Sequence, residues 1–209
     1  MRTSVLTILV VPFLACAQVK DDAIIKKGVD VSKHVPKGIE AGQQAPEIVG
    51  VSVDGRQVES KAMVEDKELV LIFYRGNWCP YCSRHLSNLN DSLQYLTQAG
   101  AEVVVIGPEN FESAHKTQEK TESDFILLPD TSMQLMQAYD VLFTVTKRYK
   151  GKIKTFLFTD IAENNGQDEA MLPVPATYII GRDHNVKWRH FDYDYTKRAS
   201  VKEILDHLK

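Results

Sequence analysis

The sequence predicts an α/β fold, and three consecutive stretches carry that prediction. Residues 69–74 (LVLIFY) form a continuous apolar run, as expected for a central strand buried on both faces. Leucines at helical spacing come next, and residues 103–106 (VVVI) form a second apolar run. A strand, a helix and a strand at this spacing indicate a βαβ unit with parallel strands.

The predicted helix begins at two cysteines in the sequence Trp78-Cys79-Pro80-Tyr81-Cys82. Pro80 suits the first helical turn, and Gly100 suits the C-terminal cap, so one helix is expected between them. Its apolar stripe repeats at offsets of four and three. The members of the stripe are Cys82, Leu86, Leu89, Leu93 and Leu96.

The other elements follow from shorter patterns. Asp54-Gly55 is a hairpin turn signal between short strands at residues 49–53 and 56–58. Ser200 and Glu203 form a capping box for a C-terminal helix. Further elements are expected as helices at 111–120 and around Met133, Met136 and Tyr139, and as strands at 125–128, 177–180 and 186–191. Residues 141–145 and 153–158 fit either strands or loops, and 163–167 fit a loop.

Size and charge narrow the class of protein. The chain has 209 residues, which is enough for one full core and predicts a single domain. Its net charge of −3 does not indicate a polyanion-binding surface, so nucleic acid is not expected as a partner. Three cysteines, Cys16, Cys79 and Cys82, leave none for a disulfide framework.

The N-terminus is typical of a secretory signal spanning residues 1–17. Arg2 precedes an apolar run at residues 5–14, and small residues follow at Ala15 and Ala17. The apolar run is shorter than a transmembrane helix requires. The alternative is a buried N-terminal helix or strand. We expect export to the periplasm or cell envelope, followed by a lead-in or linker at 18–41 and a domain at 42–209.

Two processing routes stay open. Ala15-x-Ala17 fits cleavage before Gln18, which would release a soluble protein. Leu14-Ala15-Cys16 resembles a bacterial lipobox, in which a signal of residues 1–15 is removed and Cys16 becomes lipidated. A lipid anchor at Cys16 is the membrane contact that this pattern predicts.

The two clustered cysteines predict dithiol chemistry. A helix N-terminus offers unpaired N–H groups and a positive partial charge, both of which favour a thiolate. The apolar stripe turns Cys82 inward, which leaves Cys79 at an exposed tip beside Trp78. We therefore predict that Cys79 attacks and Cys82 resolves, and that Pro80 and Tyr81 tune the reduction potential.

Three other uses of the cysteines are less favoured. A static disulfide closing so short a loop gives little stability. His85 lies three residues after Cys82, but a structural zinc site needs four ligands, so His85 is expected on the helix surface or at the core edge. A c-type haem needs histidine directly after the second cysteine, where Ser83 stands. We expect no metal and no cofactor.

Pro175 precedes a predicted strand, far along the chain from the cysteines. Cis peptide bonds are essentially confined to X-Pro, and an X-Pro bond at this point can lie against a dithiol. The position predicts a cis Val174–Pro175 bond. The alternative is an ordinary trans turn proline.

From about Gly42 to Lys209, the chain resembles the thioredoxin-like superfamily, and within it the alkyl hydroperoxide reductase/thiol-specific antioxidant (peroxiredoxin-like) family. The resemblance implies a thioredoxin fold, with a central mixed sheet flanked by helices on both faces. It also implies antioxidant or thiol-disulfide oxidoreductase activity, with a redox protein, a small thiol or disulfide, or a hydroperoxide as partner. The matching motifs are GQQAP at 42–46, DG at 54–55, LVLIFYRGNWCPYC at 69–82, PD at 129–130, VPATYII at 174–180 and DYDYT at 192–196.

The departures from the family pattern favour disulfide exchange. The alignment puts Cys82 at the peroxide-reactive position, Arg75 where the family has proline, and Cys79 where it has threonine. The family's arginine before the late strand is replaced by Val174-Pro175, and the buried acid of thioredoxins is replaced by Ile72. Arg75 and Arg84 are then candidate electrostatic helpers; the alternative is solvated surface charge.

Three hypotheses remain. The favoured one is a thiol-disulfide oxidoreductase in which Cys79 attacks a disulfide and Cys82 resolves it. The second is a thiol peroxidase that works through a sulfenic acid on Cys82 or Cys79. The third is a non-catalytic envelope module that binds a partner and carries a static disulfide.

Overall fold

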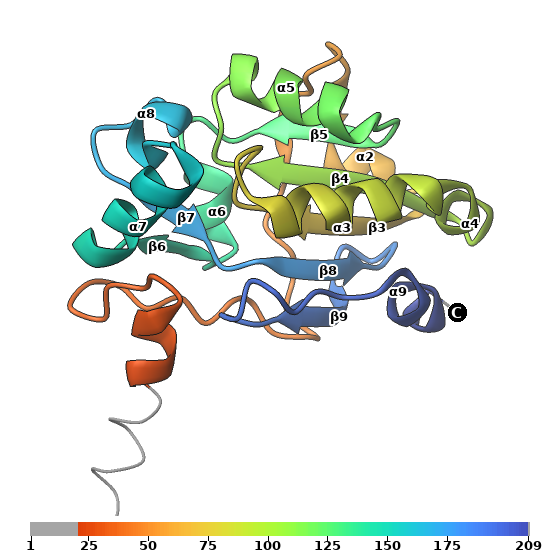
Figure 1. Ribbon diagram of the computed structural model, residues 1–209. Coiled ribbons are helices and arrows are strands. Elements are labelled where there is room, and N and C mark those ends of the chain that lie inside the picture. The colour runs from red at the N-terminus through yellow and green to blue at the C-terminus, as the bar shows by residue number, and fades with distance from the viewer. Residues whose placement is uncertain (1–20, 209) are drawn as a thin grey trace, which may run out of the picture.

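The computed structural model describes residues 21–208, which fold around a central five-stranded sheet (Figure 1). The strand order is β5-β4-β3-β8-β9. The first three strands in this order are mutually parallel, while β8 is antiparallel to both β3 and β9. The predicted α/β fold with a central mixed sheet is therefore confirmed. The strands are β3 (Glu68–Phe73), β4 (Ala101–Gly107), β5 (Ile126–Pro129), β8 (Ala176–Ile180) and β9 (Val186–Phe191).

Strand β3 lies at the centre of the sheet and feeds both cores. Side chains alternate across a strand, so Val70 and Ile72 enter one apolar cluster while Leu71 and Phe73 enter the other. All four are essentially inaccessible to solvent. This two-sided burial explains why the strand reads as an uninterrupted apolar run.

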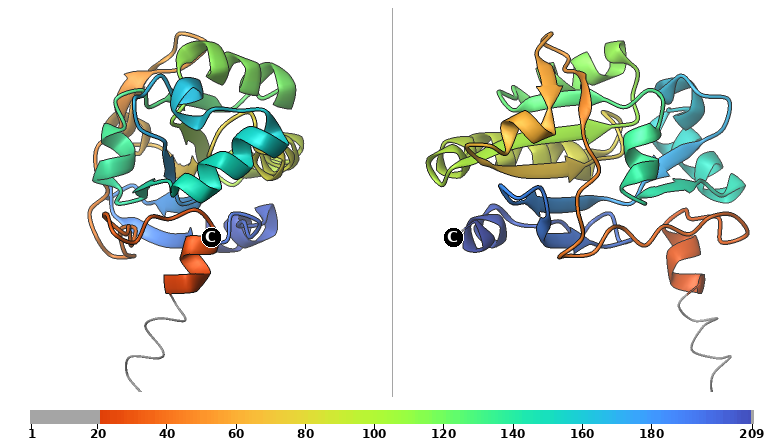
Figure 2. Two further views of the ribbon diagram at one scale, coloured as in Figure 1. Left: turned by 60° about the vertical axis from the view of Figure 1, so that its left-hand side comes forward. Right: turned by 180° about the vertical axis from the view of Figure 1, so that it is seen from behind.

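Helices cover both faces of the sheet, as Figures 1 and 2 show from opposite sides. One face carries the leucines of the predicted stripe, and the other carries Met133, Met136 and Tyr139. The covering helices are α3 (Pro80–Asp91), α4 (Leu93–Gln98), α5 (Phe111–Thr121) and α9 (Val201–His207) on the first face and α2 (Ser60–Met63) and α6 (Gln134–Ala138) on the second.

Two small antiparallel pairs complete the fold. The predicted hairpin forms from β1 (Val49–Val51) and β2 (Gln57–Glu59). A second pair joins β6 (Leu142–Thr144) to β7 (Met171–Pro173), so the strand alternative for residues 141–145 is the one observed. The predicted capping box at the start of α9 is also present, with Ser200 and Glu203 bonding to each other's backbone.

The single helix predicted between the cysteines and Gly100 is in fact two. Ser92 has φ −110° and ψ 5°, which interrupts the helix between α3 and α4. Leu96 is nevertheless fully buried, because α4 resumes along the same face. Gly100 ends this segment with a φ of +86°, a conformation that favours glycine.

The expectation of strand or loop at residues 153–158 is wrong, because α7 (Lys147–Leu157) covers most of that stretch. Thr146 caps the helix through the Tyr149 N–H, and Tyr149 and Ile153 bury one narrow face four residues apart. The expected loop at 163–167 likewise contains a short helix, α8 (Ile161–Asn165), capped by Asp160.

Residues 21–41 pack closely on the body of the protein. The lead-in or linker expected at 18–41 therefore does not describe how these residues are held. Residues 21–26 are helical, and Ile24 and Val29 are buried in the main core. Val29 forms a β-bridge with Val145, and His34 bonds Asp140 at 2.6 Å. The predicted signal and Cys16 lie outside the described residues. Within residues 21–208, no helix has the length and hydropathy needed to cross a membrane.

Candidate active site

The two cysteines lie where strand β3 turns into helix α3. Gly76 has a φ of +138°, and a Cβ there would stand 2.5 Å from Nε1 of Trp78, so this bend requires glycine. Cys79 is the N-cap of α3, and its Sγ accepts a hydrogen bond from the Cys82 N–H at 3.4 Å. The strand-bend-helix geometry predicted for this motif is therefore observed.

Both cysteines are free thiols, and both are buried. The exposed fraction is 0% for Cys79 and 1% for Cys82. The expectation that Cys79 sits at an exposed tip is therefore wrong, because buried Arg75 bonds its sulfur and Trp78 shares its apolar cluster. The exposed residues of the motif are instead Pro80 and Tyr81, the latter at 46%.

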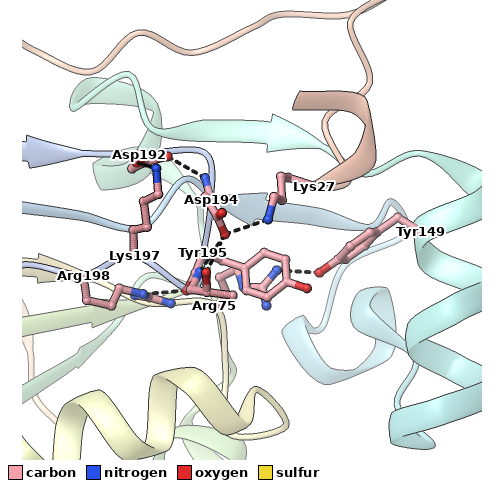
Figure 3. A network of polar contacts seen from close by, with 9 residues as sticks. Lys27, Arg75, Tyr149, Asp192, Asp194, Tyr195, Lys197 and Arg198 are labelled. Carbon is pink, nitrogen blue, oxygen red and sulfur yellow. Dashed lines mark hydrogen bonds and ion pairs between the residues drawn. The ribbon is translucent and has the colours of Figure 1, made fainter. Parts of the chain in front are cut away.

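Arg75 is a buried cation rather than a surface charge. Figure 3 shows it among the aromatic side chains Tyr149 and Tyr195. Its Nη2 donates to the Cys79 Sγ at 3.3 Å, and its Nη1 donates to the Tyr149 hydroxyl at 2.7 Å. Its guanidinium carbon lies 3.7 Å from the ring centroid of Tyr195. Arg75 therefore places a fixed positive charge beside the dithiol, the role anticipated for an electrostatic helper.

Arg198 is a candidate functional residue that the sequence did not identify. It lies between β9 and α9, and its Nη2 donates to the Cys82 Sγ at 3.3 Å. Its Nε donates to the Tyr195 carbonyl at 2.9 Å, which fixes the side chain (Figure 3). The sequence has Val174-Pro175 where the family has an arginine, and Arg198 brings a cation to the site from another segment. Arg84, the other candidate helper, is exposed and makes no hydrogen bond or ion pair within the described residues.

The segment after β9 holds both arginines in place. Tyr195 lies between them, and its ring also contacts Tyr149 and Tyr81, at centroid distances of 6.3 and 5.7 Å. Asp194 anchors this segment through an ion pair with Lys27 at 2.7 Å. Residues 192–196 were noted in the sequence only as a motif that resembles the family. The alternation of acidic and aromatic residues in this motif was the signal that could have identified the segment.

The contacts decide which sulfur ionises first. Burial alone raises the pKa of Cys82, but the hydrogen bond from Cys79 and the charges of Arg198 and Arg75 outweigh it and hold that pKa well below its ordinary value. The hydrogen bond to Cys82 raises the pKa of Cys79, as do burial and the Cys82 charge, while Arg75 opposes them. These contacts favour the negative charge on Cys82 and the proton on Cys79.

A buried carboxyl group supports the bend before the cysteines. Glu109 follows β4 and accepts hydrogen bonds from the Asn77 N–H at 2.7 Å, the Thr117 hydroxyl at 2.8 Å and the Tyr74 hydroxyl. Asn164 adds a longer contact at 3.4 Å. Burial raises the pKa of Glu109 above its ordinary value even though these bonds favour the carboxylate. The buried acid missing at Ile72 is thus matched by an acid from the neighbouring strand.

His85 lies at the edge of the core, as expected. Its Nε2 bonds the Ala199 carbonyl at 3.1 Å, which is the group directly after Arg198. Burial and the Arg198 charge lower its pKa to about 4, so the imidazole is neutral at pH 7. No cluster of three or more metal-ligating side chains occurs among the described residues.

The predicted cis bond at Val174–Pro175 is wrong, since every peptide bond between described residues is trans. The reason is visible in the backbone. Pro173 ends β7, the Val174 N–H donates to the Val141 carbonyl at 2.8 Å, and Ala176 begins β8. An extended chain held from both sides runs through Pro175, with no tight turn to favour a cis bond.

Comparison with known proteins identifies the family. A family model described as AhpC/TSA family matches residues 41–189. The chain belongs to the AhpC/TSA family. It is 30% identical to Peroxiredoxin Bcp of Bacillus subtilis over 103 residues, which are 49% of this chain and 65% of that protein. It is 22% identical to the thiol-disulfide oxidoreductase ResA of Bacillus cereus over 149 residues, 71% of this chain and 68% of that one.

Solved structures of the AhpC/TSA type share the fold. Peroxidoxin BcpB from Mycobacterium tuberculosis matches with a TM-score of 0.60 and 17% identity, over 84% of this chain and 97% of that one. Prx3 from Vibrio vulnificus matches with a TM-score of 0.63 and 14% identity, over 82% and 99%. The resemblance and the thioredoxin-like fold predicted from the sequence are confirmed, and with them the class of thiol-dependent oxidoreductases.

Proposed function

We propose that this AhpC/TSA protein is a dithiol peroxidase, in which the Cys82 thiolate attacks a hydroperoxide and Cys79 resolves the product. The observation that carries the proposal is the guanidinium of Arg198, 3.3 Å from the Cys82 sulfur. A second guanidinium, that of Arg75, donates a hydrogen bond to the Cys79 sulfur. Two fixed cations stabilise one thiolate and the negative charge that moves onto peroxide oxygen during attack.

The reaction has two steps on the protein. The Cys82 thiolate attacks the outer peroxide oxygen, an S–O bond forms, the O–O bond breaks, and the departing alkoxide takes a proton to leave as an alcohol. The Cys79 thiol then attacks the Cys82 sulfenic acid, a disulfide forms, and water leaves with the Cys79 proton. An external thiol or dithiol, in two steps of thiol exchange, supplies the two electrons that restore both thiols.

Burial of the dithiol favours a small substrate. Both sulfurs are shielded, which leaves a protein disulfide no direct approach in this state. Nε of Arg75 and Nε1 of Trp78 are buried and have no hydrogen-bond partner within the described residues. These two donors remain available beside the dithiol for a small polar substrate.

Disulfide exchange through Cys79 is the second candidate, and a specific observation favours it. The Cys79 sulfur accepts hydrogen bonds from the Cys82 N–H and from Arg75 at the N-terminus of α3, an arrangement that also stabilises a thiolate. Similarity to the thiol-disulfide oxidoreductase ResA supports the same alternative. In this mechanism Cys79 attacks a disulfide of a small thiol or a partner protein, and Cys82 resolves it.

Stopped-flow kinetics separate the two candidates. Reduced wild type, Cys79→Ser and Cys82→Ser proteins are each mixed with hydrogen peroxide and with a model disulfide. A peroxidase reacts with peroxide far faster than a free thiol does, retains that rate in Cys79→Ser and loses it in Cys82→Ser. If the protein reacts fast only with the disulfide, and Cys79→Ser loses that reaction, disulfide exchange replaces peroxidase activity as the proposed function. A protein that reacts with neither substrate is a binding module.

The cellular location is a separate part of the proposal. The secretory pattern at residues 1–17 supports export to the periplasm or envelope. The mass of the mature protein tests this: a chain starting at Gln18 indicates a soluble exported protein, and a lipid-modified chain starting at Cys16 indicates an anchored one. A mature protein that retains residues 1–17 would exclude both routes.

A further inference from the structure

Unpaired cations gather around one cavity at the end of the molecule that holds α7. The cavity has a volume of about 480 Å³, and its lining includes Lys26, Arg148 and Lys152. None of these three cations has an ion-pair or hydrogen-bond partner among residues 21–208. Most lysines elsewhere are paired, as Lys61 is with Glu47 and Lys187 with Glu68. In a chain of net charge −3, this cluster is a local excess of positive charge.

Two exposed phenylalanines extend the charged cluster. Phe156 is 70% exposed and Phe158 is 91% exposed, the two highest values among the large apolar side chains described. Arg148, Lys152 and Phe156 follow one another at intervals of four, so they form a single row along α7. Phe158 is the C-cap, held at a φ of +52°, an uncommon conformation for a bulky side chain.

The adjacent face of α7 packs on the protein. Tyr149 and Ile153 are buried, and the Tyr149 hydroxyl holds Arg75 beside Cys79. Lys150 and Lys154 both form ion pairs with Asp160, at 3.7 and 3.1 Å. The helix thus has a packed face, an edge of paired lysines and a free edge that carries unpaired cations and exposed aromatic rings.

The N-terminal segment meets this free edge. Ile25, which is 37% exposed, and Lys26 belong to the helical residues 21–26 and line the same cavity as Arg148 and Lys152. Twenty residues precede this segment in the sequence, and they include the apolar run at 5–14. The chain outside the described residues therefore joins the body of the protein beside the patch.

We infer that this patch, defined as Ile25, Lys26, Arg148, Lys152, Phe156 and Phe158, docks on the surface of an anionic phospholipid bilayer. Lysine and arginine near such a surface each contribute about 1 kcal/mol of attraction, and aromatic rings enter the headgroup region. Two exposed phenylalanines two positions apart, rimmed by unpaired cations, match that chemistry better than a protein interface. The inference is independent of the peroxidase proposal, since it concerns a different surface.

Vesicle flotation of the full chain tests the inference. Vesicles of phosphatidylcholine alone are compared with vesicles that also contain phosphatidylglycerol, at low and at high salt. We expect binding that depends on the anionic lipid and weakens with salt. Lys152→Glu should weaken it about tenfold or more, because one attraction becomes a repulsion. Phe158→Ser should weaken it at every salt concentration, because it removes the inserted ring.

Two variants away from the patch serve as matched controls. Arg182→Glu changes the charge by the same amount in the turn between β8 and β9, and Phe111→Ser removes an exposed ring at the start of α5, where it is 51% exposed. Neither should alter binding. Equal binding to both kinds of vesicle, or equal loss in Arg182→Glu and Lys152→Glu, would overturn the inference. Complete competition by soluble glycerophosphate would also overturn it, because the patch would then bind a free phosphate. A dimer that Phe158→Ser dissociates would overturn it as well, because the patch would then be an interface between two copies of the chain.

Discussion

Arg198 donates a hydrogen bond to the Cys82 sulfur at 3.3 Å, although 116 residues separate the two along the chain. The AhpC/TSA chain thereby brings a cation from its C-terminal segment to the first turn of α3. This contact lowers the pKa of the thiol at the position that aligns with the peroxide-reactive cysteine of the family. Under the proposed function, this contact favours Cys82 over Cys79 as the attacking thiol.

Removing this cation should slow the reaction with peroxide at neutral pH. Arg198→Met removes one of the charges that hold the pKa of Cys82 below its ordinary value, so that pKa should rise. A lowered pKa keeps the thiolate present at every pH above it, so the wild-type rate should be flat around neutrality. The variant should lose about tenfold or more at pH 7 and recover as the pH rises toward 9. The measurement is the second-order rate with hydrogen peroxide as a function of pH.

Arg84 provides the control for that experiment. It is an exposed arginine on the same helix as Cys82, two residues away along the chain. Arg84→Met should leave the rate and its pH profile unchanged within a factor of about two. Equal losses in Arg84→Met and Arg198→Met would mean that general surface charge, and not the contact with Cys82, sets the rate.

Tyr195 should matter to stability through its ring. The ring lies 3.7 Å from the buried Arg75 guanidinium, and loss of such a desolvated cation–π contact costs about 2 kcal/mol. Tyr195→Ala should therefore lower the free energy of unfolding by about 2–3 kcal/mol, and Tyr195→Phe should lower it little. Urea denaturation measures both. Tyr95→Ala, at a 54% exposed position on α4, is the control and should change stability by less than about 0.5 kcal/mol.

Glu109 should be required for the bend before the cysteines. Glu109→Leu leaves the Tyr74 and Thr117 hydroxyls and the Asn77 N–H without their acceptor in a buried site. The expected loss is about 3 kcal/mol or more of unfolding free energy, and Glu109→Gln should cost less because one acceptor oxygen remains. Glu112→Leu removes an exposed carboxylate from α5 and should be nearly neutral. Equal effects of Glu109→Leu and Glu112→Leu would contradict the support assigned to Glu109.

His85 should make the protein less stable in mild acid. Burial and Arg198 lower its pKa from 6.5 to about 4, so between these values the unfolded chain binds a proton that the folded chain does not. Stability is therefore lost as the pH falls from 6.5 toward 4. With its partial exposure discounted, the loss should be about 2 kcal/mol. Urea unfolding at several pH values should show that His85→Gln removes this part of the slope.

The comparison of wild type with His85→Gln isolates that group, because both proteins keep the opposing titration of Glu109, whose raised pKa favours the folded state as pH falls. His115→Gln, at an exposed histidine of α5, is the matched control and should keep the wild-type slope. A slope that persists in His85→Gln would assign the acid sensitivity to other groups.

Much of the fold could be predicted from local patterns. The central strand β3 has a two-sided apolar run, and the leucines that follow recur at helical spacing, so both were recognisable without tertiary information. Helix α7 was missed because its buried face consists of little more than Tyr149 and Ile153 among lysines. The interruption at Ser92 was missed because the apolar stripe continues across it.

The site was harder to predict, because its chemistry comes from segments far apart in the sequence. The cysteines, Trp78 and Arg75 are local to the motif and were identified. Arg198 and Glu109 approach from other parts of the chain, and no spacing rule relates either to Cys82. The burial of Cys79 likewise depends on Arg75, a residue that sequence alone places on the surface.

Direct titration of each thiol tests the central claim that Cys82 carries the negative charge. Thiolate absorbance near 240 nm is followed against pH in Cys79→Ser, where Cys82 remains, and in Cys82→Ser, where Cys79 remains. The account predicts that Cys82 titrates well below the ordinary value of about 8.5 and that Cys79 titrates above Cys82. A Cys79 pKa lower than that of Cys82 would contradict the account and make Cys79 the attacking thiol.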